Sequence, residues 1–137
     1  MVAHILPSRV PGFSPERRIL LIGEHWPLLK SSAEVLKKTN AEISYCSPEE
    51  IAECWTEHFH LIVLCHTVSA AEAESIAADA RWRWPGVRIL QISRFDFGAV
   101  RVPAYADAGA VGGEPDDLFT SAMALLGRKP PPKAIAS

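Results

Sequence analysis

The stretch Leu61-Ile62-Val63-Leu64, followed by Cys65 and His66, is the most apolar part of the chain. An unbroken run of branched apolar residues is typical of a parallel β-strand that helices cover on both faces. Two more runs have this character, Ile19-Leu20-Leu21-Ile22 and Arg88-Ile89-Leu90-Gln91-Ile92. The three runs predict buried strands over 18–23, 61–65 and 88–93 at the centre of an α/β sheet.

Helix signals separate these strands. Pro27 suits the first turn of a helix, and apolar residues recur after it with helical spacing. Ser47 and Ser69 each precede a glutamate by three residues, which is the capping-box spacing that starts a helix. We therefore expect helices over 27–39, 48–58, 70–84 and 115–126, and two further short strands over 41–46 and 109–113. Right-handed crossovers place these elements in a five-stranded parallel sheet of order 2-1-3-4-5, with helices on both faces.

The composition indicates one globular domain. The 137 residues carry a net charge of −2, which provides no overall field to recruit nucleic acid or an anionic membrane. No apolar run approaches the roughly 20 residues of a membrane span, and the proline-interrupted start lacks a secretory signal. The three cysteines fit reduced thiols better than a disulfide framework. We expect a cytoplasmic protein with a flexible leader over 1–16, one domain over 17–127 and a Pro-rich tail over 128–137.

A polar residue follows each of the three central strands. These residues are Glu24, Cys65 and Ser93. The predicted strand order places the three strand ends side by side, and ligands of open α/β sheets gather at the carboxyl ends of the strands. The candidate site therefore lies at this edge of the sheet.

Several short segments of the chain, and the order in which they occur, are similar to those of one known protein family. They are Arg18–Ile22 before an acidic position, Pro27-Leu28-Leu29, His60–Cys65, Trp84–Ile89, Ala108-Gly109-Ala110 and Glu114–Leu118. Together they resemble the receiver domain of bacterial two-component response regulators, the CheY-like family, and they cover residues 17–126. The resemblance implies a flavodoxin-like three-layer sandwich. The chain departs from the family over 94–106, where Gly98 and Pro103 disfavour the fourth helix.

The same resemblance implies which residues stand at the family's phosphorylation pocket. The family phosphorylates an aspartate after the third strand, and an acidic pair after the first strand holds Mg²⁺ there. Here Cys65 stands at the acceptor position, Gly23 and Glu24 at the acidic pair, Ser93 at the Ser/Thr position, and Glu114 at or near the lysine position. A thiol forms no acyl phosphate and offers no hard oxygen to Mg²⁺. We therefore expect that Mg²⁺ binding and aspartyl phosphorylation are lost, as in a degenerate receiver, or pseudo-receiver.

The function implied by the resemblance is that of a non-catalytic signalling module that needs no cofactor and acts through protein contacts. The partner is then another protein or a second copy of the chain in a homodimer, and not a nucleic acid or a membrane. An aromatic group with interleaved arginines offers a candidate interface or core edge. It consists of Trp82, Trp84, Phe95 and Phe97. The acidic balance of the chain argues against stacking of nucleic-acid bases on these rings.

Two other functions remain open on the same residues. A phosphorelay receiver could use a non-standard acceptor such as His66. A small thiol or metal-dependent enzyme could use Cys65 as its nucleophile, with His66 as a base and Glu24 as an orienting acid. The residues Glu24, His25, Cys65 and His66 are also ligand types of Zn²⁺, although no CxxC or HxxxH spacing occurs.

Overall fold

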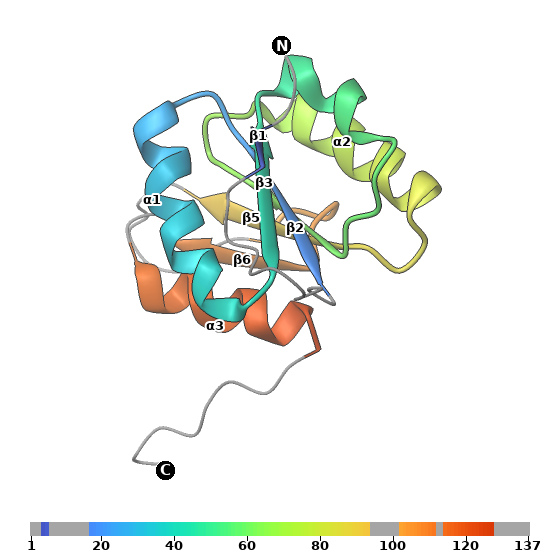
Figure 1. Ribbon diagram of the computed structural model, residues 1–137. Coiled ribbons are helices and arrows are strands. Elements are labelled where there is room, and N and C mark those ends of the chain that lie inside the picture. Colours follow the sequence, from blue (N-terminus) through green and yellow to red (C-terminus); the bar gives the residue numbers. More distant parts are fainter. Residues whose placement is uncertain (1–3, 6–16, 94–101, 112–113, 128–137) are drawn as a thin grey trace.

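The computed structural model describes residues 4–5, 17–93, 102–111 and 114–127, which fold into three layers around one sheet (Figure 1). Within these residues the strand order is β1-β3-β2-β4-β5-β6. The strands are β1 (His4–Ile5), β2 (Arg18–Ile22), β3 (Glu42–Cys46), β4 (Leu61–Leu64), β5 (Arg88–Ser93) and β6 (Ala108–Val111). Strands β2 to β6 all pair in parallel. Taken alone they have the order 2-1-3-4-5, so the predicted flavodoxin-like topology is confirmed.

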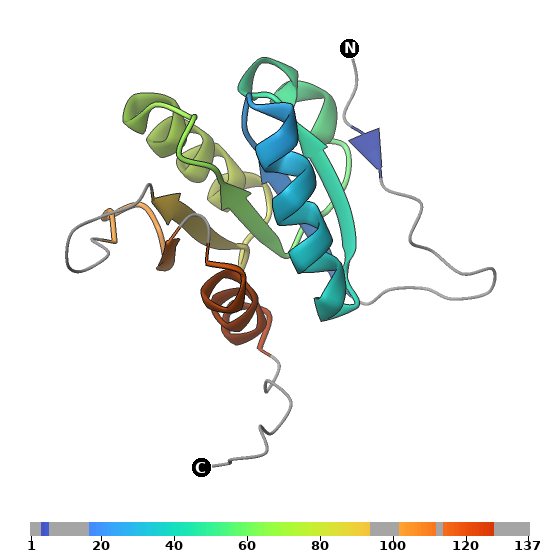
Figure 2. The same cartoon turned by 90° about the vertical axis from the view of Figure 1, so that its left-hand side faces the viewer.

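Helices cover both faces of the sheet. On one face α1 (Trp26–Leu36) packs beside α3 (Pro115–Leu125), and α1 continues into the short 3₁₀ helix η1 (Lys37–Thr39). On the other face lie α2 (Ala70–Arg83) and the 3₁₀ helix η2 (Pro48–Cys54). Figures 1 and 2 show α1 and α3 on the opposite side of the sheet from α2. The sheet is therefore covered on both faces at its centre.

Strand alternation divides the apolar side chains into two cores. In β2, Ile19 and Leu21 face α1 and α3, whereas Leu20 and Ile22 face α2. All four side chains are fully buried, as are the four side chains of β4. Full burial of one such side chain contributes about 1.5–3 kcal/mol to folding. The continuous apolar runs in the sequence are explained by this double covering.

The N-terminal strand β1 was not predicted. The sequence pattern indicated a flexible leader over 1–16, but His4 and Ile5 pair antiparallel with Tyr45 and Ser44 of β3. Without this pairing, β3 would be an edge strand with a row of unpaired backbone groups. Two residues are too few to show an alternating pattern, so the strand is set by the partner and not by its own sequence.

The predicted helix over 48–58 is a 3₁₀ helix that ends at Cys54. Its start is as predicted, because Ser47 and Glu50 form a capping box in which the Ser47 N–H donates to Glu50 Oε1 at 3.1 Å. Pro48, Ile51 and Cys54 are three residues apart and face inward to different degrees. This spacing matches the three residues per turn of a 3₁₀ helix better than the 3.6 of an α-helix.

The remaining elements lie close to their predicted positions. Asn40 ends the first helical segment in the left-handed conformation, with φ of 67°. Ser69 caps α2 by accepting a hydrogen bond from the Glu72 N–H at 3.2 Å. Of the segment predicted to be irregular, 102–106 contains neither helix nor strand, and 94–101 lies outside the described residues.

We expect Ser69→Ala to lower the free energy of unfolding by about 1 kcal/mol, because the first turn of α2 loses its side-chain acceptor. Ser75 is exposed in the interior of the same helix and provides the matched control. Ser75→Ala should leave stability unchanged or raise it slightly, since alanine is the better helix former. Urea unfolding of both variants measures the difference. Equal effects of the two substitutions would show that the cap contributes nothing.

Candidate functional site

The carboxyl ends of β2, β4 and β5 lie next to one another, as the sequence predicted. In the sheet register Ile22 pairs with Leu64, and Leu64 pairs with Gln91. The Cys65 N–H extends this pairing by donating to the Ile22 carbonyl oxygen at 2.9 Å. The residues that follow the three strands therefore share one edge of the sheet.

Cys65 is fully buried at this edge. Its side chain belongs to the core on the α1 and α3 face, together with Val63 and Leu29. Burial raises the pKa of the thiol to about 12, because no described group compensates the loss of hydration of the thiolate. Cys65 is therefore a neutral, space-filling residue near neutral pH and not an activated nucleophile.

Gly23 and Cys65 lie close together at the ends of β2 and β4. A Cβ atom on Gly23 would lie 2.9 Å from Cys65 Cβ and 3.1 Å from both Cys65 Sγ and Leu29 Cδ2. Real Cβ atoms essentially never come so near to another carbon that is fixed to the backbone, so a side chain at this position would force the two strand ends apart. The position where the receiver resemblance expects an acid thus has no room for one.

Glu24 lies outside this packed contact. Its side chain is exposed, and its backbone N–H donates to Thr67 Oγ1 at 3.1 Å, which ties the loop after β2 to the loop after β4. Ser93 is the last residue of β5, where it pairs with Val111 of β6 and is partly buried. Glu114 is exposed at the start of α3.

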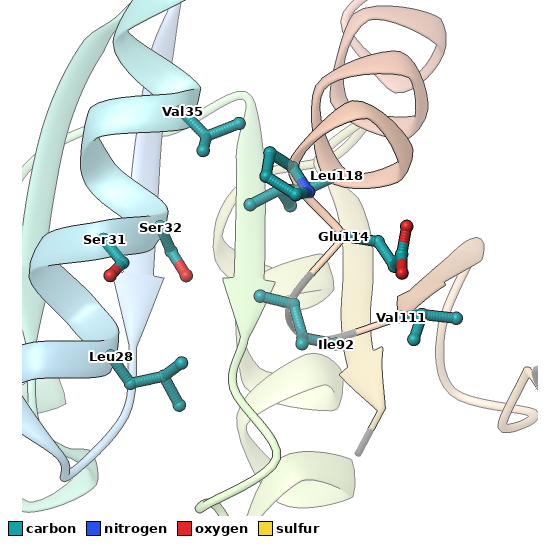
Figure 3. Close-up of a pocket in the computed structure, with 9 residues that line it drawn as sticks. Leu28, Ser31, Ser32, Val35, Ile92, Val111, Glu114 and Leu118 are labelled. Carbon is teal, nitrogen blue, oxygen red and sulfur yellow. The ribbon is translucent and has the colours of Figure 1, made fainter. Parts of the chain in front are cut away.

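A cavity of about 280 Å³ opens between α1 and α3 (Figure 3). Its wall is formed by Leu28, Ser31, Ser32, Val35, Ile92, Val111, Glu114, Pro115 and Leu118. Of the four residues predicted for the phosphorylation pocket, Glu114 lines this cavity. The residues of α1 that line the cavity were not predicted. Whether they line a cavity depends on how far α1 lies from α3, and the sequence does not show this distance.

The candidate metal ligands have different environments. Glu24 and His25 are exposed, whereas Cys65 is fully buried. Across the described ranges, no three His, Cys, Asp or Glu side chains gather into a group that could hold a metal ion. In the same ranges no helix has the length and apolar character needed to cross a membrane.

The predicted aromatic group is divided by the structure. Trp84 is 4% exposed and packs against Phe59 and Trp55, with ring centroids 5.3 and 5.1 Å away. Trp82 is 79% exposed, at the end of α2. Between them in sequence, the Arg83 guanidinium lies 4.8 Å from the centroid of the Trp55 ring. Trp84 is therefore a core residue and Trp82 a surface residue, while Phe95 and Phe97 lie outside the described residues.

Sequence reasoning also missed a polar contact next to the site. Gln91 is buried in β5, where its Nε2 donates to the carbonyl oxygens of Leu64 and Ile92 at 3.1 and 2.8 Å. The Tyr105 hydroxyl donates to Gln91 Oε1 at 2.7 Å. These bonds attach the segment before β6 to the centre of the sheet. The sequence feature that could have indicated this contact is the single glutamine within the apolar run of β5.

Comparison with solved structures identifies the fold family. A CheY-like response regulator receiver domain protein from Methanospirillum hungatei JF-1 is 19% identical, with a TM-score of 0.65 over 81% of this chain and 94% of that chain. The chain has the receiver fold. An uncharacterized protein from Neptuniibacter caesariensis matches with 15% identity and a TM-score of 0.67, over 84% of this chain and 90% of that chain. No protein-family model and no curated protein matches the sequence.

A further structure with the receiver fold is that of histidine kinase ThkA in complex with response regulator protein TrrA. A chain of that complex is 18% identical, with a TM-score of 0.64 over 80% of this chain and 98% of that chain. At these identities the likeness extends to the fold, and the chemistry must be argued from the residues of this chain.

We expect Cys65 to react very slowly with alkylating reagents in the folded protein. The variant Cys46→Ala/Cys54→Ala leaves Cys65 as the sole thiol. A pKa raised from 9.0 to about 12 reduces the thiolate population roughly 1000-fold near pH 8. Iodoacetamide labelling of the folded variant, followed by mass spectrometry, should therefore be much slower than labelling in urea. A native rate equal to the unfolded rate would instead support a reactive thiol.

Proposed function

We propose that this chain is a non-catalytic, receiver-like signalling module that acts through protein contacts and is not phosphorylated on an aspartate. The observation that carries the proposal is the contact between Cys65 and Gly23 at the ends of β4 and β2. By the receiver resemblance, these positions belong to the phosphoacceptor and to one of the metal-binding acids. In this chain they hold a buried thiol and a glycine without space for a side chain.

Loss of Mg²⁺ binding is part of the proposal. A receiver needs carboxylates around the cation, because Mg²⁺ prefers hard oxygen ligands and offsets the charge of the transferred phosphoryl group. Of the proposed pocket, only Glu24 retains a carboxylate on the metal-binding side, and its side chain is exposed. Glu114 stands at or near the position of the phosphoryl-binding lysine, where a negative charge would repel a phosphoryl group.

A protein partner is supported by the comparison and by the surface. The structure of TrrA with ThkA is a complex between a response regulator and a histidine kinase. In this chain, Trp82 is 79% exposed and lies beside Arg83, and tryptophan and arginine are enriched where protein interfaces are strongest. We propose Trp82 as an interface residue, with a second copy of this chain or another signalling protein as the partner.

The test of the proposal is incubation of the whole chain with acetyl phosphate and Mg²⁺, followed by intact-mass measurement. We expect no phosphoryl adduct, and we expect no shift of the Glu24 and Cys65 amide resonances when Mg²⁺ is added. A receiver that retains its aspartate, treated in parallel, provides the positive control. A stoichiometric adduct would contradict the proposal.

The position of any adduct separates the alternatives. An acid-labile phosphoramidate mapped to His66 would indicate a phosphorelay receiver with a non-standard acceptor. An adduct on an aspartate or glutamate would indicate that ordinary acyl-phosphate chemistry survives elsewhere on the chain.

A further inference from the structure

Two buried cysteines lie in contact beside the candidate site. Cys46 is the last residue of β3 and Cys54 is the last residue of η2, and their Sγ atoms are 3.7 Å apart. Each residue is 2% exposed and packs in the core on the α2 face of the sheet. Cys65 belongs to the core on the opposite face. The sheet therefore separates the pair from the third thiol of the chain.

The geometry of the pair allows a disulfide after a small adjustment. A disulfide has an S–S length of about 2.05 Å, so the two sulfurs must approach by roughly 1.7 Å. The element that carries Cys54 is a single 3₁₀ helix of seven residues, whose hydrogen bonds are poorer than those of an α-helix. Its residues Glu49, Ala52 and Glu53 are exposed. Local opening of η2 would thus expose Cys54 without unpairing the strands of the sheet.

The contact also makes the two thiols unequal. The pKa of Cys54 is lowered by its hydrogen bond with Cys46. The pKa of Cys46 is raised by the same contact and by burial. Cys54 is the residue on the element that can open, so its thiol is the one that a reagent reaches first.

We propose that Cys46 and Cys54 form a reversible dithiol–disulfide pair that a low-molecular-weight disulfide, such as glutathione disulfide, oxidises. The Cys54 thiolate attacks one sulfur of the reagent, which forms a mixed disulfide and releases one small thiol. Cys46 then attacks the Cys54 sulfur, and the second small thiol leaves. Two protein S–H bonds and one reagent S–S bond are exchanged for one protein S–S bond and two reagent S–H bonds. The protein loses two electrons, and the reagent gains them.

Oxidation of the cysteine pair would change the backbone position at the candidate site. The Gly23 N–H donates to the Cys46 carbonyl oxygen at 3.1 Å, and a Cβ on Gly23 would lie 2.9 Å from Cys65 Cβ. A shift of Cys46 therefore moves the end of β2 and the loop that carries Glu24. This consequence rests on the proposed function, since it would give a module without phosphorylation a different input. The dithiol pair itself does not rest on it.

The test is equilibration of the full chain in glutathione buffers of increasing oxidised fraction, followed by acid quenching, alkylation and peptide mapping. We expect the number of free thiols to fall from three to one, with a Cys46–Cys54 cross-linked peptide, no retained glutathione and full reversal by dithiothreitol. Cys46→Ser and Cys54→Ser should each abolish the cross-link, while Cys65→Ala should leave it intact. Oxidation of Cys65 to the same extent, glutathione adducts alone, an intermolecular disulfide, or three free thiols in every buffer would each overturn the proposal.

A second measurement separates the pair from its effect on the site. In spectra of the ¹⁵N-labelled chain, the amide resonances of Gly23 and Glu24 should shift on oxidation, and those of α3 should not. If the cross-link forms but the Gly23 resonance does not shift, the proposed effect of oxidation on the candidate site is wrong, whereas the proposed dithiol–disulfide pair is still supported. The phosphodonor experiment is independent of both results, so failure of the proposed function is distinguishable from failure of this inference.

Discussion

Steric contact between Gly23 and Cys65 is the constraint on which the candidate site depends. The two residues continue adjacent parallel strands, and a Cβ on Gly23 would lie 2.9 Å from Cys65 Cβ. The Cys65 side chain packs in the core that the sheet forms with α1 and α3. Because the interior is closely packed, a side chain at Gly23 would have to displace Cys65 or Leu29.

The polar side chains at the carboxyl-terminal edge of the sheet lie around the contact between Gly23 and Cys65. Glu24 extends into solvent while its backbone is held by Thr67, and Glu114 lies at the α3 side of the sheet, where it lines the cavity against α1. On the other side of β2 within the sheet, the Gly23 N–H donates to the Cys46 carbonyl oxygen of β3. The end of β2 thus lies between two cysteines, and each of them forms a backbone hydrogen bond with it.

The central strands and their order could be predicted because full burial on both faces requires unbroken apolar runs, which are visible in Ile19–Ile22 and Leu61–Leu64. The cap at Ser69 was predictable because a helix start depends on local hydrogen bonds. Sequence could not show the pairing of β1, the cavity between α1 and α3, or the contact of Cys46 with Cys54. Each of these depends on the distance between elements, and no local spacing encodes that distance. The sequence predicted Cys65 at the end of a buried strand, but its contact with Gly23 required the structure.

A double-mutant cycle on Gly23 and Cys65 tests the central claim most directly. We expect Gly23→Ala to lower the free energy of unfolding by about 1–3 kcal/mol, because the new Cβ overpacks against Cys65. In the Cys65→Gly background the same substitution should cost much less, since the opposing Cβ and Sγ are gone and only Leu29 Cδ2, the end of a flexible side chain, must move. The coupling free energy should then exceed about 1 kcal/mol. Equal effects of Gly23→Ala in the two backgrounds would show that the strand ends are not in contact and would contradict the closed site.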